Sequence, residues 1–435
     1  MKPAPVKLPV FYFPQKPYGI ILILVLIALV SCNSQNKVSE WPCYHGSDRS
    51  NKSAETGLLT EWPEAGPELM WEFAGLGDGY SSVSIAEDMI FTAGIADSQT
   101  CVFALNLDGE LLWKKANGAA WSTTMPWARS YTGARSTPTY DKGILYHLGE
   151  TGRLAAYKAL DGEEIWAVDL MDEFEAEMPE YGYAESVLVD KDRLYVRPAG
   201  KKAFQVCLDK RDGKLLWIND QIPGAEGYSS PVLMDYGGRR QVLGSSSNSY
   251  YAADAFTGKL LWKVDWENQR GLNVPDPVIS RDKVFITSGY GKGCMLFSLQ
   301  KEGDSIVPVP VWQSELLDNH HGGVILHDGY LYGSGSSSRG WFCLDLANGE
   351  QMWNADGKGS ITFADGMLYT LDERGTMKLV QASPGEYLVK GEFRIPEGGK
   401  GLSWAHPVVF GGKLYIRHAD RLFAYDIRAN NTVSE

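Results

Sequence analysis

A turn, a glycine and a tryptophan four residues after that glycine recur along this chain. Five copies have this form, at residues 108–113, 161–166, 212–217, 257–262 and 348–353, and looser copies end at Trp71 and Trp312. Asp-Gly and Asn-Gly reach positive φ at low cost, so such copies are expected to close β-hairpins. Successive tryptophans lie 41 to 53 residues apart. A period of about 40–50 residues with several strands per unit is typical of a β-propeller.

Two further parts of the repeat each occur eight times. First strands are expected to open near residues 81–83, 135–138, 184–187, 228–231, 274–277, 321–324, 359–361 and 405–408. Second strands are expected at residues 89–91, 144–146, 194–196, 241–243, 284–286, 330–332, 367–369 and 414–416. The last unit, residues 405–427, stops after three strands, and the strand around residues 69–73 would supply its fourth. We therefore predict an all-β, eight-bladed propeller whose ring is closed by an N-terminal strand. Seven blades are the alternative if residues 375–396 form only a loop.

The first 31 residues are expected to be a targeting segment. Three lysines and no acidic residue precede an apolar run at residues 20–30, which is too short to span a bilayer comfortably. The run ends in Leu-Val-Ser before Cys32, which resembles a bacterial lipobox, in which the cysteine is acylated and becomes the first residue. A signal peptide with an incidental cysteine is the alternative. Because two or three acyl chains anchor a protein stably, we expect a lipoprotein held in the cell envelope through Cys32. Asn33, rather than aspartate, favours the outer membrane.

These signals divide the chain into four parts. Residues 1–31 are the expected lipoprotein signal peptide, 32–67 a lipidated tether and leader, 68–428 the propeller, and 429–435 a C-terminal tail. The repeat runs without interruption, so one closed propeller is predicted although the length alone would suggest about three domains.

Charge and cysteine spacing exclude two classes of partner. The formal net charge is −13 and no basic stripe compensates it, so nucleic-acid phosphates would be repelled. No Cys-x-x-Cys pair occurs, which removes the patterns of covalent haem and of cysteine-based metal sites. We predict no metal site and no nucleic-acid partner, and we expect a monomer.

The repeat resembles that of the quinoprotein (PQQ-like) β-propeller family, and the resemblance covers the chain from Trp41 onward. The opening Trp-Pro-Cys-Tyr-His-Gly-Ser-Asp-Arg at residues 41–49 is similar to the leader of the bacterial envelope branch of that family. So are Asn-His-His-Gly-Gly at 319–323 and Trp-Ala-His-Pro at 404–407.

The resemblance implies two functions of different kinds. The family includes PQQ-dependent dehydrogenases and the non-catalytic lipoprotein scaffold of the outer-membrane barrel-assembly machinery. We expect a binding or assembly scaffold, with a PQQ-dependent dehydrogenase that oxidises an alcohol or sugar as the alternative. Such an enzyme would bind PQQ with Ca²⁺, and many members stack the quinone on a vicinal disulfide. This chain has no adjacent cysteines and is shorter than those enzymes. An envelope protein, a small molecule or a glycan would be the partner of a scaffold.

Candidate site residues come from the openings of the first strands, which line the channel of a propeller. Residues expected to bind a ligand or cofactor there are Arg135, Glu185, His321, Trp404 and His406, and those expected to move a proton are Asp276 and His320. The resemblance adds that Arg135 would neutralise an anionic group and that Trp404 would stack on a ring. Adjacent histidines on a strand would point to opposite sides, so His320 and His321 do not suggest a metal site. In the alternative interpretation these side chains bond only one another and water.

Overall fold

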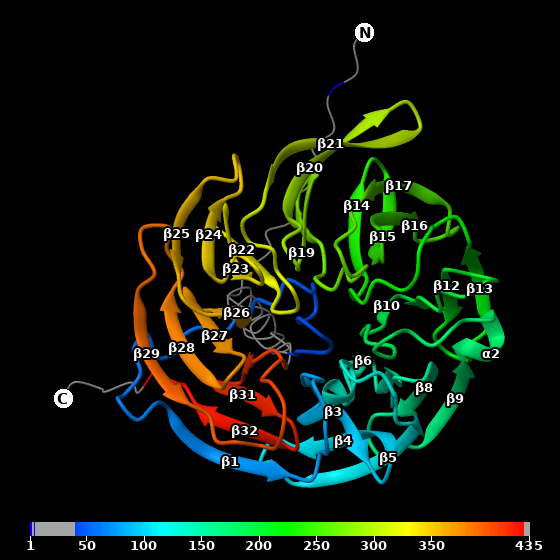
Figure 1. Ribbon diagram of the computed structural model, residues 1–435. Coiled ribbons are helices and arrows are strands. Elements are labelled where there is room, and N and C mark those ends of the chain that lie inside the picture. Colours follow the sequence, from blue (N-terminus) through cyan, green and yellow to red (C-terminus); the bar gives the residue numbers. More distant parts are fainter. Residues whose placement is uncertain (2–3, 5–39, 430–435) are drawn as a thin grey trace. The chain divides into compact units, whose positions relative to one another are not determined.

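Residues 40–429 form eight antiparallel sheets of four strands, arranged around a common axis like the blades of a propeller (Figure 1). The structure is a computed structural model that describes residues 1, 4 and 40–429. The expected signal peptide, Cys32 and the tail from residue 430 lie outside the described residues. Among the residues described, no helix is long and apolar enough to cross a membrane.

The first four blades follow one another along the chain. Blade 1 contains β2 (Ser84–Ala86), β3 (Met89–Ala96), β4 (Gln99–Asn106) and β5 (Leu111–Ala119). Blade 2 contains β6 (Thr139–Asp141), β7 (Ile144–Leu148), β8 (Arg153–Lys158) and β9 (Glu164–Asp169). Blade 3 contains β10 (Leu188–Asp190), β11 (Arg193–Val196), β12 (Gln205–Asp209) and β13 (Leu215–Asn219). Blade 4 contains β14 (Val232–Tyr236), β15 (Arg239–Ser246), β16 (Ser249–Asp254) and β17 (Leu260–Asp265).

The remaining blades complete the ring. Blade 5 contains β18 (Val278–Ser280), β19 (Lys283–Ser288), β20 (Gly293–Glu302) and β21 (Ser305–Ser314). Blade 6 contains β22 (Val324–His327), β23 (Tyr330–Gly335), β24 (Gly340–Asp345) and β25 (Gln351–Ala355). Blade 7 contains β26 (Gly359–Ala364), β27 (Met367–Asp372), β28 (Thr376–Gln381) and β29 (Val389–Arg394). Blade 8 contains β30 (Val408–Phe410), β31 (Lys413–His418), β32 (Arg421–Asp426) and β1 (Glu68–Ala74). A short 3₁₀ helix, η1 (Arg129–Tyr131), follows blade 1, and the helix α2 (Leu170–Phe174) follows β9.

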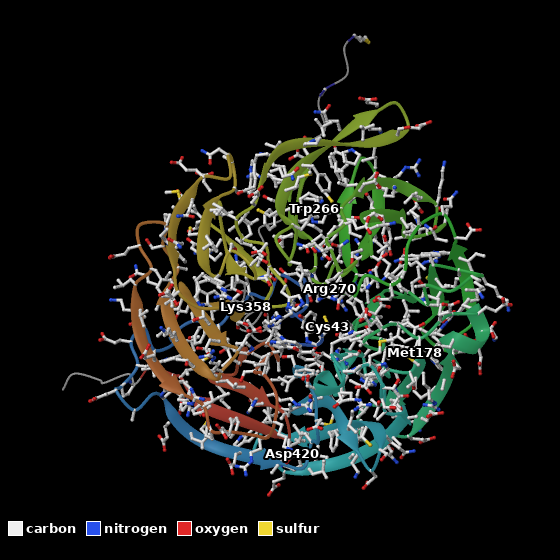
Figure 2. The ribbon with its side chains drawn as sticks, viewed as in Figure 1. Cys43, Met178, Trp266, Arg270, Lys358 and Asp420 are labelled. Carbon is white, nitrogen blue, oxygen red and sulfur yellow. The ribbon has the colours of Figure 1, made fainter. Side chains whose placement is uncertain are left out.

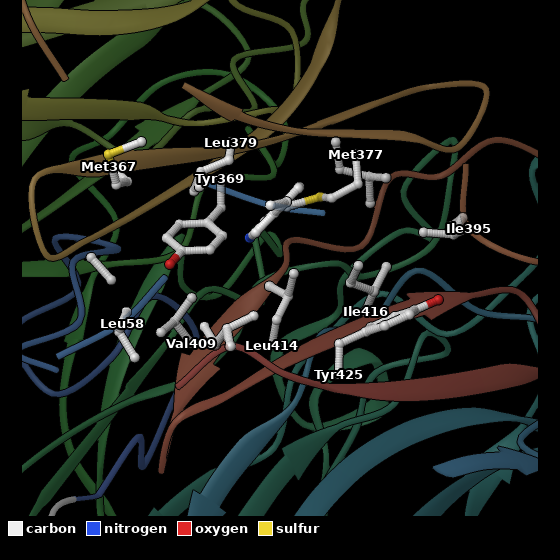
Figure 3. Packing of buried hydrophobic residues seen from close by; sticks show 14 of the residues in the cluster. Leu58, Met367, Tyr369, Met377, Leu379, Ile395, Val409, Leu414, Ile416 and Tyr425 are labelled. Carbon is white, nitrogen blue, oxygen red and sulfur yellow. The ribbon is translucent and has the colours of Figure 1, made fainter. Parts of the chain in front are cut away.

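The ring closes as predicted, because β1 at the start of the propeller pairs antiparallel with β32 at its end. Residues 375–396 supply β28 and β29, so the prediction of eight blades is confirmed and the seven-bladed alternative is wrong. The joint is packed with apolar side chains. Figure 3 shows Tyr369 and Leu379 of blade 7 against Val409, Leu414 and Tyr425 of blade 8.

Six of the seven tag tryptophans, as we name the tryptophan of each repeat copy, join their own blade to the next one. The indole N–H donates to a carbonyl of the following blade over 2.8–3.1 Å, in the pairs Trp71–Leu107, Trp113–Ala159, Trp166–Lys210, Trp217–Ala255, Trp312–Leu346 and Trp353–Ser383. The glycine of the next copy packs on the ring: a Cβ on Gly258 would lie 2.5 Å from a ring carbon of Trp217. Trp262 is the exception. In blade 5 the long hairpin of β20 and β21 replaces the tight turn that carries the tag glycine, and the Trp262 indole donates to Gln241 within its own blade.

The inner strands begin three or four residues later than predicted in seven of the eight blades. The expected openings at 135–138, 228–231, 274–277 and 405–408 each contain a proline, which offers no N–H to a strand ladder. These segments therefore form irregular entry loops in front of the strands. Three of the seven candidate site residues, Arg135, Asp276 and His406, lie on these loops, and the other four lie in the segments before β10, β22 and β30.

Candidate functional site

The leader, residues 41–67, lies across one end of the ring. Trp41 exchanges two backbone hydrogen bonds with Ile85 of blade 1, and Pro42 accepts one from Tyr140 of blade 2. Arg49 donates to two backbone carbonyls in the loop before blade 3, over 2.9 and 2.6 Å. Further contacts reach Ile361 and Phe363 of blade 7 and Leu326 of blade 6. Figure 1 shows this segment in blue near the centre of the ring, and Figure 2 labels its Cys43 there.

A buried series of three side chains fastens the leader to the ring. Asp276, in the loop before blade 5, lies 3.3 Å from Nδ1 of His45, and Nε2 of His45 lies 3.0 Å from Nδ1 of His406, before blade 8. Nε2 of His406 lies 2.8 Å from the carbonyl of His321, which can only accept a hydrogen bond, so this nitrogen carries the proton. His45 must then donate to His406. Its Nδ1 faces Oδ2 of Asp276, a buried carboxylate oxygen that has no hydrogen-bond partner among the described residues.

Above the leader lies a cavity of about 510 Å³, which is in the usual range for small-molecule sites. Tyr44 of the leader lines it and hydrogen-bonds to His406 over 3.2 Å. Trp404 forms part of one wall. Its indole N–H donates to Glu373 over 2.9 Å, and the ring of Tyr131, from η1, stacks on it at 5.3 Å between centroids. The cavity is thus bounded by the leader and by the loop that follows blade 1.

Burial controls the protonation of the cavity histidines. It lowers the pKa of His406 to about 3, with a further contribution from His45. It lowers the pKa of His320 to about 4, helped by Lys358, and that of His321 well below its ordinary value. These three imidazoles are therefore neutral at pH 7. They can accept or donate hydrogen bonds to a ligand without adding charge.

The cationic side chains of the cavity are arginines and a lysine. Arg135 lies over the rings of Tyr80 and Trp121, at 5.5 and 5.4 Å from their centroids, and donates to backbone carbonyls of its own loop. Burial lowers its pKa. Lys358 pairs with Glu373 over 3.1 Å. Lys358 lies in the loop between blades 6 and 7, and Arg270 lies in the loop between blades 4 and 5. Figure 2 shows both residues near the centre of the ring.

The structure brings six of the seven sequence-predicted site residues together. The residues that line the one cavity are Arg135, Asp276, His320, His321, Trp404 and His406. Their roles in binding or catalysis stay predictions. His320 and His321 were expected on opposite sides of a strand, but they lie in a bend before β22 and both face the cavity. Trp404 already has Tyr131 stacked on it, so a ligand ring would have to use its other surface or displace Tyr131.

Glu185 does not line this cavity. Its carboxylate is fully buried and accepts from Arg197, whose Nε lies 2.7 Å away. The entry loop directs the Glu185 side chain into the interface between neighbouring blades instead of towards the axis of the ring. Glu185 is therefore a buried ion-pair partner of Arg197.

Sequence reasoning missed several residues that line the cavity, namely Tyr44, Tyr80, Arg270, Tyr290, Lys358 and Glu373. Tyr44 and His45 belong to the conspicuous leader segment, and their chemistry could have marked them. The others lie in loops between repeats, where the periodic pattern gives no signal.

The carboxylates of the cavity do not fit a PQQ site with a divalent cation. Such a site needs several free oxygen ligands close together. Asp276 is bonded to the Ser230 N–H over 2.6 Å and faces His45, and Glu373 is bonded to Trp404 and Lys358. Among the described residues, no group of three or more histidine, cysteine or acidic side chains is placed to hold a metal ion. Oδ1 of Asp276 and Oε1 of Glu373 are thus already used by the protein's own donors and cations, and these two carboxylates are the only acidic groups among the described residues that line the cavity.

Comparison with known proteins gives similarities of two kinds. A family model described as outer membrane protein assembly factor BamB matches residues 98–355, more than half of the chain. A curated outer membrane protein assembly factor BamB from Shewanella oneidensis is 26% identical over 138 residues. That match spans 31% of this chain and 33% of the relative, so the chain aligns with only about a third of the relative's length.

Solved structures share the fold. The crystal structure of BamB from Moraxella catarrhalis matches with a TM-score of 0.60 at 14% identity, over 83% of this chain and all of that one. A quinohemoprotein alcohol dehydrogenase from Pseudomonas putida matches with a TM-score of 0.59 at 12% identity, over 91% of this chain and 81% of that one. At these identities both matches show the propeller fold alone.

Proposed function

The chain belongs to the family described as outer membrane protein assembly factor BamB, and from this membership we propose that it is an assembly scaffold of the cell envelope. The family match over residues 98–355 carries the proposal, because it extends from blade 1 to blade 6. The partners would be envelope or outer-membrane assembly proteins. A second role as a PQQ-dependent dehydrogenase has less support, since the cavity carboxylates are already bonded within the protein.

The outer strands of the blades offer surfaces for such partners. On β13 of blade 3, Leu215, Leu216 and Ile218 are all more than 40% exposed. The equivalent leucines of β17 in blade 4, Leu260 and Leu261, are partly buried. β13 is also the outermost strand of its sheet, so one edge of its backbone has no strand beside it in the blade. Exposed apolar side chains on an unpaired strand edge are typical of a protein-interaction surface.

A co-purification experiment tests the scaffold proposal. We expect the full-length protein, extracted from native membranes in mild detergent, to bring down an outer-membrane assembly protein identified by mass spectrometry. A photo-crosslinking residue at Leu216 should give an adduct with that partner, whereas one at Lys301, on the β20–β21 hairpin of blade 5, serves as the matched surface control. Recovery of the protein alone from native membranes, with no adduct at either position, would contradict the proposal.

We further propose that the protein is held in the envelope by acyl chains on Cys32, which lies outside the described residues. The support is the lipobox-like Leu-Val-Ser-Cys sequence. Cys32→Ala should remove the acyl mass from the intact protein and release it from the membrane fraction, because a chain without its lipid loses its anchor. Cys43→Ala is the control, since Cys43 is buried in the leader. Membrane attachment that survives in Cys32→Ala would refute the anchor.

A further inference from the structure

The acidic side chains of the central cavity have ionic partners, whereas two of its basic side chains have none among the described residues. Its two carboxylates, Asp276 and Glu373, are engaged by His45 and Lys358. Two of its cations are not matched in this way: within residues 40–429, no ion pair includes Arg135 or Arg270, although both line the cavity. Arg135 is also partly buried and bonds only to carbonyls. Glu150 is the acidic group that acts most on Arg135, but it makes no ion-pair contact with it and bonds to Thr100 and Trp121 instead. A carboxylate of a ligand would form the ion pair that Arg135 lacks.

The lining also provides hydrogen-bonding groups that the protein leaves unused. Nε2 of His321 is buried and has no hydrogen-bond partner within the described part of the chain. The hydroxyl groups of Tyr80 and Tyr131 bond to no other described residue, and both rings lie beside Trp404, at 5.2 and 5.3 Å between centroids. A purely apolar ring placed here would cover these groups without bonding to them, which is unfavourable. A ring that carries hydroxyl groups would satisfy them.

The volume limits the size of the ligand. A cavity of about 510 Å³ is within the range of about 300–1,000 Å³ that is usual for small-molecule sites. That space accommodates a molecule of one or two sugar rings. The cavity is therefore a small-molecule site that is separate from the outer strand surfaces of the scaffold.

We propose that this cavity binds acidic sugars of the hexuronic acid class, with the ligand carboxylate on Arg135 and Arg270 and the ring among Tyr80, Tyr131 and Trp404. The proposal is independent of the scaffold role. It would stand if no envelope partner were found, and the scaffold role would stand if the cavity bound no sugar.

A matched pair of ligands tests the proposal directly. Galacturonate and galactose differ only at C6, where the first has a carboxylate and the second a hydroxymethyl group. We expect calorimetric titration of the full-length protein to give an affinity for galacturonate at least about 10-fold higher than for galactose, as for hydrogen bonds to a charged group. Arg135→Gln should abolish this preference. Arg281→Gln, which replaces an exposed arginine in the turn between β18 and β19, should leave it unchanged.

Arg270→Gln is a second variant for the case that Arg135→Gln does not fold. The Arg270 side chain is exposed, so its loss leaves the fold intact. It should weaken galacturonate binding and leave galactose binding unchanged. Equal affinities for the two sugars, or no binding of galacturonate, would overturn the proposal. Arginine-dependent binding of benzoate without binding of galacturonate would also overturn it, in favour of an aromatic acid.

Discussion

Trp217→Ala is expected to lower the free energy of unfolding by about 3–5 kcal/mol, as truncation of a buried aromatic side chain does. Trp217 is only 8% exposed, and its indole N–H donates to Ala255 of the next blade over 3.1 Å. Gly258 of that blade has a positive φ of 75° and lies flat against the ring. The substitution therefore leaves a cavity at the interface between blades 3 and 4 and removes one of the two donors of the Ala255 carbonyl, which keeps the Tyr195 hydroxyl.

Urea denaturation followed by circular dichroism measures this loss. Trp127→Ala is the control, because Trp127 is 58% exposed and is not one of the tag tryptophans. Its loss should change the free energy of unfolding by about 0.5 kcal/mol or less. Similar losses for the two variants would mean that the tag tryptophans do not hold the blades together. Trp217→Phe should fall between them, since it keeps part of the ring and loses the indole N–H.

The propeller could be predicted from sequence because its determinants are local. Seven of the eight blades carry a tag tryptophan, five of them with a turn glycine four residues before it, and the spacing of these copies indicates the ring whatever lies between them. In four of the seven blades whose inner strand begins later than predicted, a proline such as Pro231 or Pro277 lies in the expected opening and offers no N–H to the strand ladder. The exception at Trp262 is next to blade 5, where the long β20–β21 hairpin replaces the tight glycine turn.

The candidate site could be predicted only where the repeat itself fixes position. Asp276 and His406 occupy entry loops, so the topology alone brings them to the axis. His45 could not be placed in this way, because it lies in the leader and reaches Asp276 across 231 residues of sequence without any periodic relation. Glu185 was assigned to the cavity by the same repeat argument. The position of its partner Arg197, which turns it away, depends on packing between blades.

The Arg197 cluster gives the second large expected effect. Arg197 is fully buried after β11 and contacts two carboxylates, Glu185 at 2.7 Å and Glu226 at 3.1 Å. It also donates to the backbone carbonyls of Ser229 and Ser245. Removal of one member of a buried ion pair typically costs about 3–5 kcal/mol, because it leaves an uncompensated charge. Arg197→Met should therefore lower the free energy of unfolding by at least about this amount at pH 8.

The size of that loss should depend on pH. Burial raises the pKa of Glu226 to about 7, although Arg197 lowers it. A folded-state pKa above the unfolded value contributes stability that is fully present below about pH 4.5 and lost as the pH rises through about 7. In Arg197→Met the carboxylates have no cation, and protonation at low pH removes their unpaired charge. The loss caused by Arg197→Met should therefore be smaller at pH 5 than at pH 8, as measured by urea denaturation at each pH.

The chain contains its own control for this cluster. Arg417 occupies the same repeat position in blade 8, after Leu-Tyr-Ile where Arg197 follows Leu-Tyr-Val. Arg417 is equally buried but donates to the backbone carbonyls of Ser81, Ala93 and Ala419, and none of the described ion pairs includes it. Burial lowers its pKa to about 10, so it stays charged at pH 8. Arg417→Met should cost about 1–3 kcal/mol, for carbonyls left without a donor, with little change between pH 5 and pH 8. An Arg197→Met loss that is equally independent of pH would show that Glu185 and Glu226 do not depend on Arg197 for their charge.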